Sequence, residues 1–226
     1  ILRGLVGSEM CIRDRLMHCS NNTIGDNDRG LGMLSLALFA KAPILGETKT
    51  RLQDALGPEG ALEAHCELVQ YALSQLSLFE QKKTGTQIEL WTSADHPAAR
   101  HWAQTFDLPL KIQCGDDLGA RMNHALADQL SRGAEHAIVM GCDCPLLDRE
   151  YLRWVTEHVG ASDVIIAPAE DGGYGLIGVA AAQPALFLDM PWGSSLVLEE
   201  TMRRARNNGL KVMLGEPIWD VDRPED

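Results

Sequence analysis

The chain has no apolar run near the ~18 residues that a membrane-spanning helix needs, so no membrane span is expected. It is also poor in positive charge, with 20 Lys and Arg against 32 Asp and Glu and a formal net charge of -12. A nucleic-acid surface requires a basic patch or stripe, so this balance argues against a nucleic-acid partner. It favours instead a small anionic ligand that is held in a local positive pocket.

Several familiar motifs are absent. The six cysteines lack the spacing of a zinc site, and a chain of this size does not need disulfides, so we expect reduced thiols and a cytoplasmic location. The C-x-C pair around Asp143 leaves metal binding open as an alternative to small residues at a tight strand end. Neither a P-loop nor a G-x-G-x-x-G after a strand occurs, so a dehydrogenase-type dinucleotide fold is unsupported. No Ser-His-Asp or Cys-His arrangement is suggested either.

What remains is a pattern of apolar strands alternating with amphipathic helices, which predicts a mostly parallel sheet with helices on both faces. At 226 residues, one domain is the default. We therefore predict the α/β class, with a single doubly wound domain. The expected strands are 34–40, 88–92, 108–113, 137–141, 164–168, 174–179 and 210–214, and the expected helices are 58–79, 97–106, 115–133, 148–158 and 194–208.

The first 32 residues do not fit this pattern. They have no sustained apolar stretch of the signal-peptide kind, and VGSEMCIRDR resembles translated adapter sequence. We predict that residues 1–32 are a disordered, non-native leader and that the domain occupies residues 33–226. Met33 is the expected start, with Met17 as the alternative.

The most informative segment is LALFAKAPILGETKTRL, a buried strand followed by a cationic loop. The loop concentrates Lys41, Lys49 and Arg51 in a chain that is acidic overall. In open α/β sheets, ligands bind beyond the carboxyl ends of the strands, so we predict an anion site here. Thr48 or Glu47 is expected to open the following helix, whose free N–H groups would add to that site.

Carboxylates follow three later strands. Asp143 comes directly after the uncharged strand AIVMG and is well placed to hold Mg²⁺ or Mn²⁺, with capping of the next helix as the alternative. Asp171, Gly172 and Gly173 form a binding loop, a D-G hairpin turn, or both. Asp222 is a candidate second carboxylate on the same cation, or part of an ordinary polar C-terminus.

Together these residues predict a phosphate-bearing ligand held by Lys41, Lys49 and Arg51, with Mg²⁺ or Mn²⁺ bridging it to Asp143. Two weaker candidates remain open. Residues 117–122 could form a ligand-facing helix start or a capped surface helix. Trp192 could line an acceptor pocket or belong to the core.

Five ordered motifs resemble the DUF2064 family, a member of the GT-A, nucleotide-diphospho-sugar transferase superfamily often described as arsenosugar-biosynthesis-type glycosyltransferases. They are K-A-P-x-x-G-x-x-K-T-R-L, D-L-G-x-R-M, G-x-D-x-P-x-L, D-G-G-Y-x-L-I-G and D-V-D-x-P-E-D. The resemblance spans residues 33–226. Relatives continue with a helix beyond the position of Asp226, which leaves open that the sequence is a fragment.

The resemblance implies a GT-A fold, a nucleotide-activated donor and a divalent cation. On the matching positions, Lys41, Gly46, Lys49 and Arg51 would form the nucleotide loop. The metal-binding aspartate would be Asp143, although it stands in G-C-D-C-P rather than in a D-x-D pair. Asp222 would supply the second carboxylate, and Asp171, Gly172 and Gly173 would lie beside the donor sugar or the acceptor.

The leading reaction is glycosyl transfer from a nucleotide-sugar to the hydroxyl of a small-molecule acceptor. The loop lysines, Lys49 among them, and the cation held by Asp143 would stabilise the leaving diphosphate. If the configuration inverts, Asp171 is the candidate base. The alternative is nucleotidyl transfer with release of pyrophosphate, because the loop also resembles the P-x-x-x-x-K-S/T-R-L loop of phospholactate guanylyltransferases. A non-catalytic nucleotide-binding role is a third possibility, and the oligomeric state is not predicted.

Overall fold

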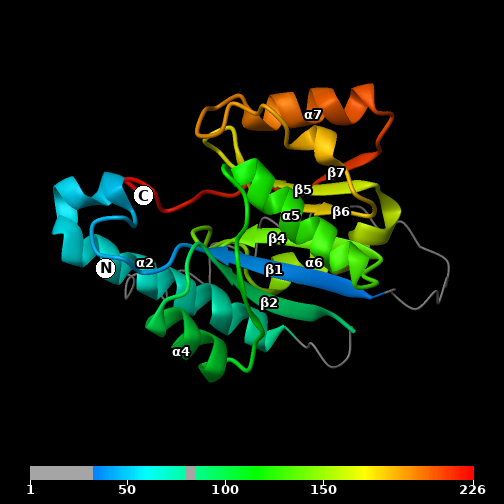
Figure 1. Ribbon diagram of the computed structural model, residues 1–226. Coiled ribbons are helices and arrows are strands. Elements are labelled where there is room, and N and C mark those ends of the chain that lie inside the picture. Colours follow the sequence, from blue (N-terminus) through cyan, green and yellow to red (C-terminus); the bar gives the residue numbers. More distant parts are fainter. Residues whose placement is uncertain (1–32, 80–84) are drawn as a thin grey trace. The chain divides into compact units, whose positions relative to one another are not determined.

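The computed structural model describes residues 33–79 and 85–226, and the predicted leader lies outside these residues. Within this part the strands form one seven-stranded sheet in the order β3-β2-β1-β4-β6-β5-β7 (Figure 1). The strands are β1 Leu34–Ala40, β2 Gln87–Thr92, β3 Leu110–Ile112, β4 His136–Gly141, β5 Val164–Pro168, β6 Tyr174–Val179 and β7 Val212–Leu214. The helices are α2 Gln53–Leu78, α4 Pro97–Thr105, α5 Leu118–Ser131, α6 Arg149–His158 and α7 Val197–Asn207, with short 3-10 turns η3 Thr50–Leu52, η4 Val159–Ala161 and η5 Pro184–Leu186.

The sheet is parallel except around β6, which runs antiparallel to both β4 and β5. The hairpin that joins β5 to β6 confirms the return strand expected after the D-G-G turn. The remaining pairs are all parallel, so the α/β class with a mostly parallel sheet is confirmed.

Alternate residues of each central strand feed two separate cores. Leu36 and Leu38 of β1 pack with apolar residues of α2, α4 and α6, whereas Ala37 and Phe39 pack with those of α5 and α7. Every residue of β1 is buried, as expected for a strand that is covered on both faces. The helices therefore lie in two layers, α2 and α4 on one side and α5 and α7 on the other (Figure 1).

The order of the strands reverses beside β1. From β1 the chain steps outward through β2 to β3, and then returns to form β4 on the other side of β1. The last residues of the two central strands are level, because Phe39 pairs with Gly141. The loops that leave β1 and β4 therefore begin side by side, and such a switch point is where open α/β sheets bind ligands.

Helix α2 departs from the sequence expectation in one respect. Gly57 (φ 71°) kinks it, so regular helix begins at Pro58 as predicted. The buried face, however, includes Ala61, His65 and Leu68 rather than Leu62 and Cys66, which are only half-buried. The helical spacing of the apolar residues predicts the rest of the face, Val69, Leu73, Leu76 and Phe79, which are all buried. It misses His65 because histidine is polar.

A buried polar network lies on the face of β2 that α5 covers. The Glu89 side chain is 4% exposed, and its Oε2 accepts a hydrogen bond from Arg132 Nη2 at 2.8 Å. Arg132 Nη1 forms an ion pair with the other carboxylate oxygen, Oε1, also at 2.8 Å. The Glu89 carboxylate also accepts a hydrogen bond from the Trp91 indole N–H at 3.0 Å. Asp128 pairs with both Arg132 and Lys111, so the network links β2, β3 and α5. A buried carboxylate satisfied in this way stabilises the fold, and its loss would leave unpaired donors.

Candidate functional site

The loop after β1 is tied to the sheet and to α2 by hydrogen bonds to its backbone. The Ala42 N–H donates to the Ser93 hydroxyl at 2.9 Å. His65 Nε2 donates to the Lys41 carbonyl at 2.9 Å, and the Gln53 amide donates to the Gly46 carbonyl at 3.1 Å. These bonds hold the loop in place, while the Lys41 residue itself stays exposed.

The helix start predicted here is wrong. Neither Thr48 nor Glu47 caps a helix; the chain enters η3 from Lys49, which makes no side-chain capping bond and has a left-handed backbone (φ 43°). Thr48 is buried at 1% exposure, and its hydroxyl has no hydrogen-bond partner within the residues that the structure describes. The backbone turns at Lys49, and the Lys49 side chain points into the protein. The left-handed backbone conformation costs of order 1–3 kcal/mol.

Lys49 contacts Asp143 across the switch point. Its Nζ lies 3.1 Å from Asp143 Oδ2, and the Lys49 side chain is 7% exposed whereas that of Asp143 is 38% exposed. Burial alone would lower the pKa of Lys49, but the charge and hydrogen bond of Asp143, together with the charges of Cys142 and Asp222, outweigh it and the pKa is raised. For Asp143, burial raises the pKa, but the Lys49 charge and hydrogen bond outweigh it and the pKa is lowered. Both groups are therefore charged at neutral pH.

The C-terminal segment brings Asp222 to the same edge. The Val221 N–H donates to the Asp143 carbonyl at 2.9 Å, and Ile218 bridges to Ala169 at the end of β5. Asp222 forms an ion pair with Arg51. Figure 1 shows this segment reaching the start of α2, which follows the cationic loop. The predicted carboxylates of Asp143 and Asp222 thus lie together with the predicted cationic side chains of Lys49 and Arg51.

The turn between β5 and β6 also lies at this edge. Asp171 is exposed, and its Oδ1 accepts the Gly173 N–H at 2.8 Å. Gly172 (φ 90°) packs so tightly that a Cβ built on it would lie 2.2 Å from the Ser195 carbonyl oxygen. Its own carbonyl accepts the Leu198 N–H at the start of α7. Only glycine fits here, so the D-G-G sequence is explained by the hairpin and its docking onto α7.

Replacing Gly172 with Ala should therefore lower the free energy of unfolding by roughly 2–6 kcal/mol, the sum of left-handed strain and a backbone clash. The matched control is Gly193→Ala, which has a similar φ of 79° but no atom within 4 Å of the added Cβ. The control should lose only the strain, about 1–3 kcal/mol. Urea denaturation of both variants measures the difference, and equal losses would contradict the clash.

Asp220 is a further acidic residue at this edge. It belongs to the D-V-D-x-P-E-D motif, but it was not predicted as a site residue. Burial and the charges of Asp143 and Asp171 raise its pKa, so these three carboxylates are close enough to repel one another. Hard oxygen donors of this kind suit Mg²⁺ or Mn²⁺, and Mg²⁺ needs only one or two of them when phosphate and water complete its shell. Within residues 33–79 and 85–226, however, no three His, Cys, Asp or Glu side chains are grouped as a ready-made metal site.

The thiols beside Asp143 are unsuited to ligation as they stand. Cys142 and Cys144 are buried, and burial followed by the Asp143 charge raises the pKa of Cys142 to about 12 and raises that of Cys144 further. Both remain protonated at neutral pH. The small-residue reading of the C-x-C pair therefore fits the structure better than the metal reading.

No role was predicted for His65 from the sequence, yet from α2 it holds the loop after β1 by a hydrogen bond to its backbone. It is 3% exposed, bonds the Lys41 carbonyl and packs edge-on against Trp102. The signal that could have found it is its position four residues after Ala61 and four before Val69, both buried on the same helix face.

His65 should make the protein acid-sensitive. Burial lowers its pKa below the ordinary value, so its stabilising contribution is complete above about pH 6.5 and is lost as the pH falls through that range. Between pH 7 and pH 5 the melting temperature should fall less in His65→Gln than in its parent. Both proteins should carry His136→Gln, because burial also lowers the pKa of His136. Parallel pH profiles in scanning calorimetry would contradict this contribution.

The two weaker candidates have structural roles. Asp117 caps α5 by accepting the Ala120 N–H at 2.7 Å. Trp192 packs edge-on against Tyr174 and lies against Gly119 at the start of α5, where a Cβ would come within 2.6 Å of the indole. Trp192 is half-buried against the second core, so it is at least partly a packing residue.

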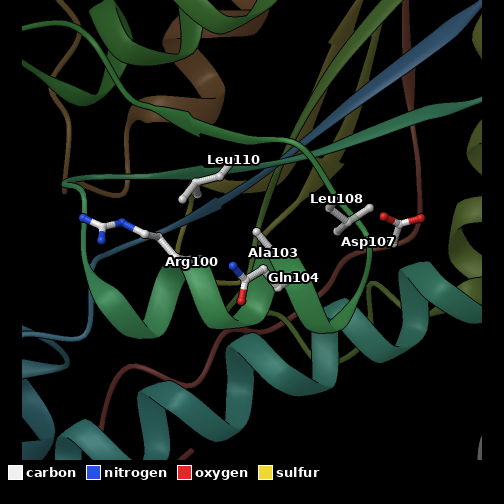
Figure 2. Close-up of a pocket in the computed structure, with 6 residues that line it drawn as sticks. All are labelled: Arg100, Ala103, Gln104, Asp107, Leu108 and Leu110. Atoms are coloured by element: carbon white, nitrogen blue, oxygen red, sulfur yellow. The ribbon is translucent and has the colours of Figure 1, made fainter.

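A hollow of about 360 Å³ lies elsewhere, between α4 and β3 (Figure 2). It is lined by Arg100, Ala103, Gln104, Asp107, Leu108 and Leu110. None of the predicted site residues lines it, and Leu108 and Asp107 precede β3, so they lie at the opposite end of that strand from the loops of the site. We place the candidate site at the carboxyl edge on chemical grounds, not at this hollow.

The fold is that of the nucleotide-diphospho-sugar transferases. A protein from Desulfovibrio desulfuricans, described provisionally as a nucleotide-diphospho-sugar transferase, superposes with a TM-score of 0.73 at 26% identity, covering 84% of this chain and 82% of its own. The chain belongs to the family described as "Uncharacterized protein conserved in bacteria (DUF2064)", whose model matches residues 78–194. The match includes Asp143, Asp171 and Gly172, and it leaves out the cationic loop and Asp222.

More distant structures share the fold only. Glucosyl-3-phosphoglycerate synthase from Mycobacterium tuberculosis, solved with Mn²⁺, UDP and glucosyl-3-phosphoglycerate, matches at 8% identity with a TM-score of 0.54, over 86% of this chain and 74% of its own. A CMP:2-keto-3-deoxy-manno-octonic acid synthetase complexed with CTP matches at 13% identity with a TM-score of 0.52, over 85% and 94%. No curated protein matches the sequence. No helix in the described part is both long and apolar enough to cross a membrane.

Proposed function

We propose that this protein is a transferase that uses a nucleotide-activated donor, and that it moves a sugar from a nucleotide-sugar to the hydroxyl of a small-molecule acceptor. The observation that carries the proposal is the meeting of Lys49 and Asp143 across the β1–β4 switch point. A buried cation and a partly exposed carboxylate at that position suit a diphosphate and its divalent cation. The likeness to the Desulfovibrio protein favours the sugar donor.

In this proposal each residue has a defined task. Lys41, Lys49 and Arg51 bind the phosphates, with the Gly46 turn giving the loop its shape. The acceptor oxygen attacks the anomeric carbon, the bond from that carbon to the phosphate oxygen breaks, and its electron pair leaves on the diphosphate. Asp171 takes the hydroxyl proton if the configuration inverts. Gly172 and Gly173 hold Asp171 in the turn.

Asp143 and Asp222 would hold Mg²⁺ or Mn²⁺, with Asp220 as a further donor. A bound divalent cation would supply charge stabilisation for the departing diphosphate. The donor chemistry fits, because these are hard oxygen ligands and the mutual repulsion that raises the pKa of Asp220 would be relieved by a cation.

Nucleotidyl transfer is the second candidate. Two cationic side chains and several carboxylates at one edge suit in-line attack on a nucleoside triphosphate equally well, with pyrophosphate as the leaving group. The likeness of the fold to that of a CTP-bound synthetase supports nucleotidyl transfer as the second candidate. Glycosyl and nucleotidyl transfer differ in the ligand that each requires, and this difference provides the test.

The deciding experiment is a thermal-shift panel with Mg²⁺ or Mn²⁺ that compares nucleoside triphosphates, diphosphates and nucleotide-sugars. Ligand at ~100 times its dissociation constant stabilises the native state by about 2.7 kcal/mol. Selective stabilisation by one nucleotide-sugar would support glycosyl transfer and identify the donor. A preference for one triphosphate would support nucleotidyl transfer, and no shift with any of them would overturn both.

A further inference from the structure

The two groups proposed to hold opposite parts of the ligand hold each other in this structure. Lys49 is a proposed phosphate ligand, Asp143 is a proposed cation ligand, and Lys49 Nζ lies 3.1 Å from Asp143 Oδ2. The ammonium group occupies Oδ2, and its positive charge repels a divalent cation that approaches the same carboxylate, so it opposes cation binding at Asp143. Neither ligand can therefore use its residue fully until this ion pair has separated.

Of the two ion pairs described at this site, the one between Lys49 and Asp143 is the one whose separation costs free energy. The Arg51 side chain is 57% exposed, so its pair with Asp222 is screened by water and can separate at little cost. The Lys49 side chain is 7% exposed, so an unpaired ammonium there would be a desolvated charge without a partner. Asp143 is open enough to meet a cation from solvent, while Lys49 depends on its partner.

Three ligated states follow from this geometry. A cation alone would take Asp143 and leave the buried Lys49 without a partner. Phosphate alone would draw Lys49 away and leave Asp143 facing another anion. With both bound, the phosphate would pair with Lys49 and Asp143 would be free to hold the cation, so every charge would have a partner. The doubly ligated state is favoured over the two singly ligated ones.

We propose that Lys49 is a coupling residue: it competes with the divalent cation for Asp143 and is released to the phosphate, so that cation and nucleotide bind as a pair. This inference rests on the proposed function, because it takes a nucleotide phosphate and a divalent cation as the ligands. Linkage requires the effect to be reciprocal, each ligand raising the affinity of the other by the same factor. Lys49 acts here through Asp143 and the phosphate, as a positioning and exchange group.

The test is the binding of Mn²⁺ alone to wild type and to Lys49→Met, with free Mn²⁺ measured by electron paramagnetic resonance. Methionine keeps the unbranched apolar part of the side chain and removes the charged end, which frees Asp143. We expect Lys49→Met to bind Mn²⁺ alone more tightly, by a factor within the roughly 5–150-fold range of typical couplings. The same variant should bind the nucleotide with Mn²⁺ more weakly than wild type. A purely structural role would weaken both.

The matched control is Lys41→Met, which removes one positive charge from the same loop, at a residue that is exposed. It accounts for long-range repulsion between a loop lysine and Mn²⁺, and it should change Mn²⁺ affinity much less than Lys49→Met does. Lys49→Gln provides a second variant if methionine impairs folding. Unchanged or weaker Mn²⁺ binding in a folded Lys49 variant overturns the inference. If wild type binds no nucleotide even with Mn²⁺, the proposed function fails, and that result is separate from the Mn²⁺-only comparison.

Discussion

Asp143→Asn is expected to lower turnover by about 10²–10³-fold with whichever donor the nucleotide panel identifies, a loss comparable to removing one preorganised electrostatic group from an active site. Asparagine keeps the size of the side chain but removes the charge that pairs with Lys49 and that would hold the cation. Binding of the nucleotide should also lose most of its dependence on Mn²⁺. The measurements are the rate of release of nucleoside diphosphate or pyrophosphate, and nucleotide affinity with and without Mn²⁺.

The matched control is Asp116→Asn, which removes one negative charge from an exposed residue in the loop after β3. It should keep turnover within a few-fold of wild type. Full turnover in a folded Asp143→Asn protein would remove Asp143 from the proposed chemistry. Loss of turnover with intact, Mn²⁺-dependent nucleotide binding would separate a catalytic role for Asp143 from the cation role proposed here.

A large effect on stability is expected away from that edge, at Glu89. Glu89→Ala would remove the carboxylate that accepts a hydrogen bond from Arg132, forms a second ion-pair contact with it, and accepts the buried Trp91 indole N–H. Breaking a buried pair of this kind typically costs 3–5 kcal/mol, which is a large share of the ~5–15 kcal/mol that stabilises an ordinary domain. Urea denaturation should show the midpoint falling accordingly.

The control for this prediction is the ion pair between Asp95 and Arg100. It has a similar two-contact geometry, at 2.7 and 2.6 Å, but both side chains are more than half exposed. Asp95→Ala should leave the melting temperature nearly unchanged, because water replaces the lost contacts. Similar losses at Glu89 and Asp95 would mean that burial is not what gives the Glu89 network its strength.

The elements were predictable where burial is complete. β1 and β5 have the predicted bounds, because a strand that is covered on both faces leaves an almost wholly apolar run in the sequence. The D-G-G sequence predicted the hairpin that joins β5 to β6. Short edge strands were less exact: β3 spans Leu110–Ile112 where 108–113 was expected, since few buried residues mark its ends.

The site was predictable as a set of residues but not as a set of contacts. Strand order decides that Lys49 meets Asp143 and that Arg51 meets Asp222, and strand order is not written in local sequence. The left-handed backbone of Lys49 was equally hidden, because an ordinary lysine gives no sign of it. His65 escaped because a polar residue on an apolar helix face breaks the pattern by which faces are found. The chemical roles assigned to these residues stay predictions.

The ion pairs at this edge also have a consequence for biosynthesis. Lys49 and Asp143 are 94 residues apart in the sequence, and Arg51 and Asp222 are 171 apart. At about 5–20 residues per second, a ribosome would add Asp222 roughly ten to thirty seconds after Arg51. During that interval the nascent chain carries the cationic loop without Asp222, and for about the first half of it without Asp143 as well. A ligand that needs both can therefore stabilise only chains that have been made as far as Asp222, and it offers no help to shorter ones.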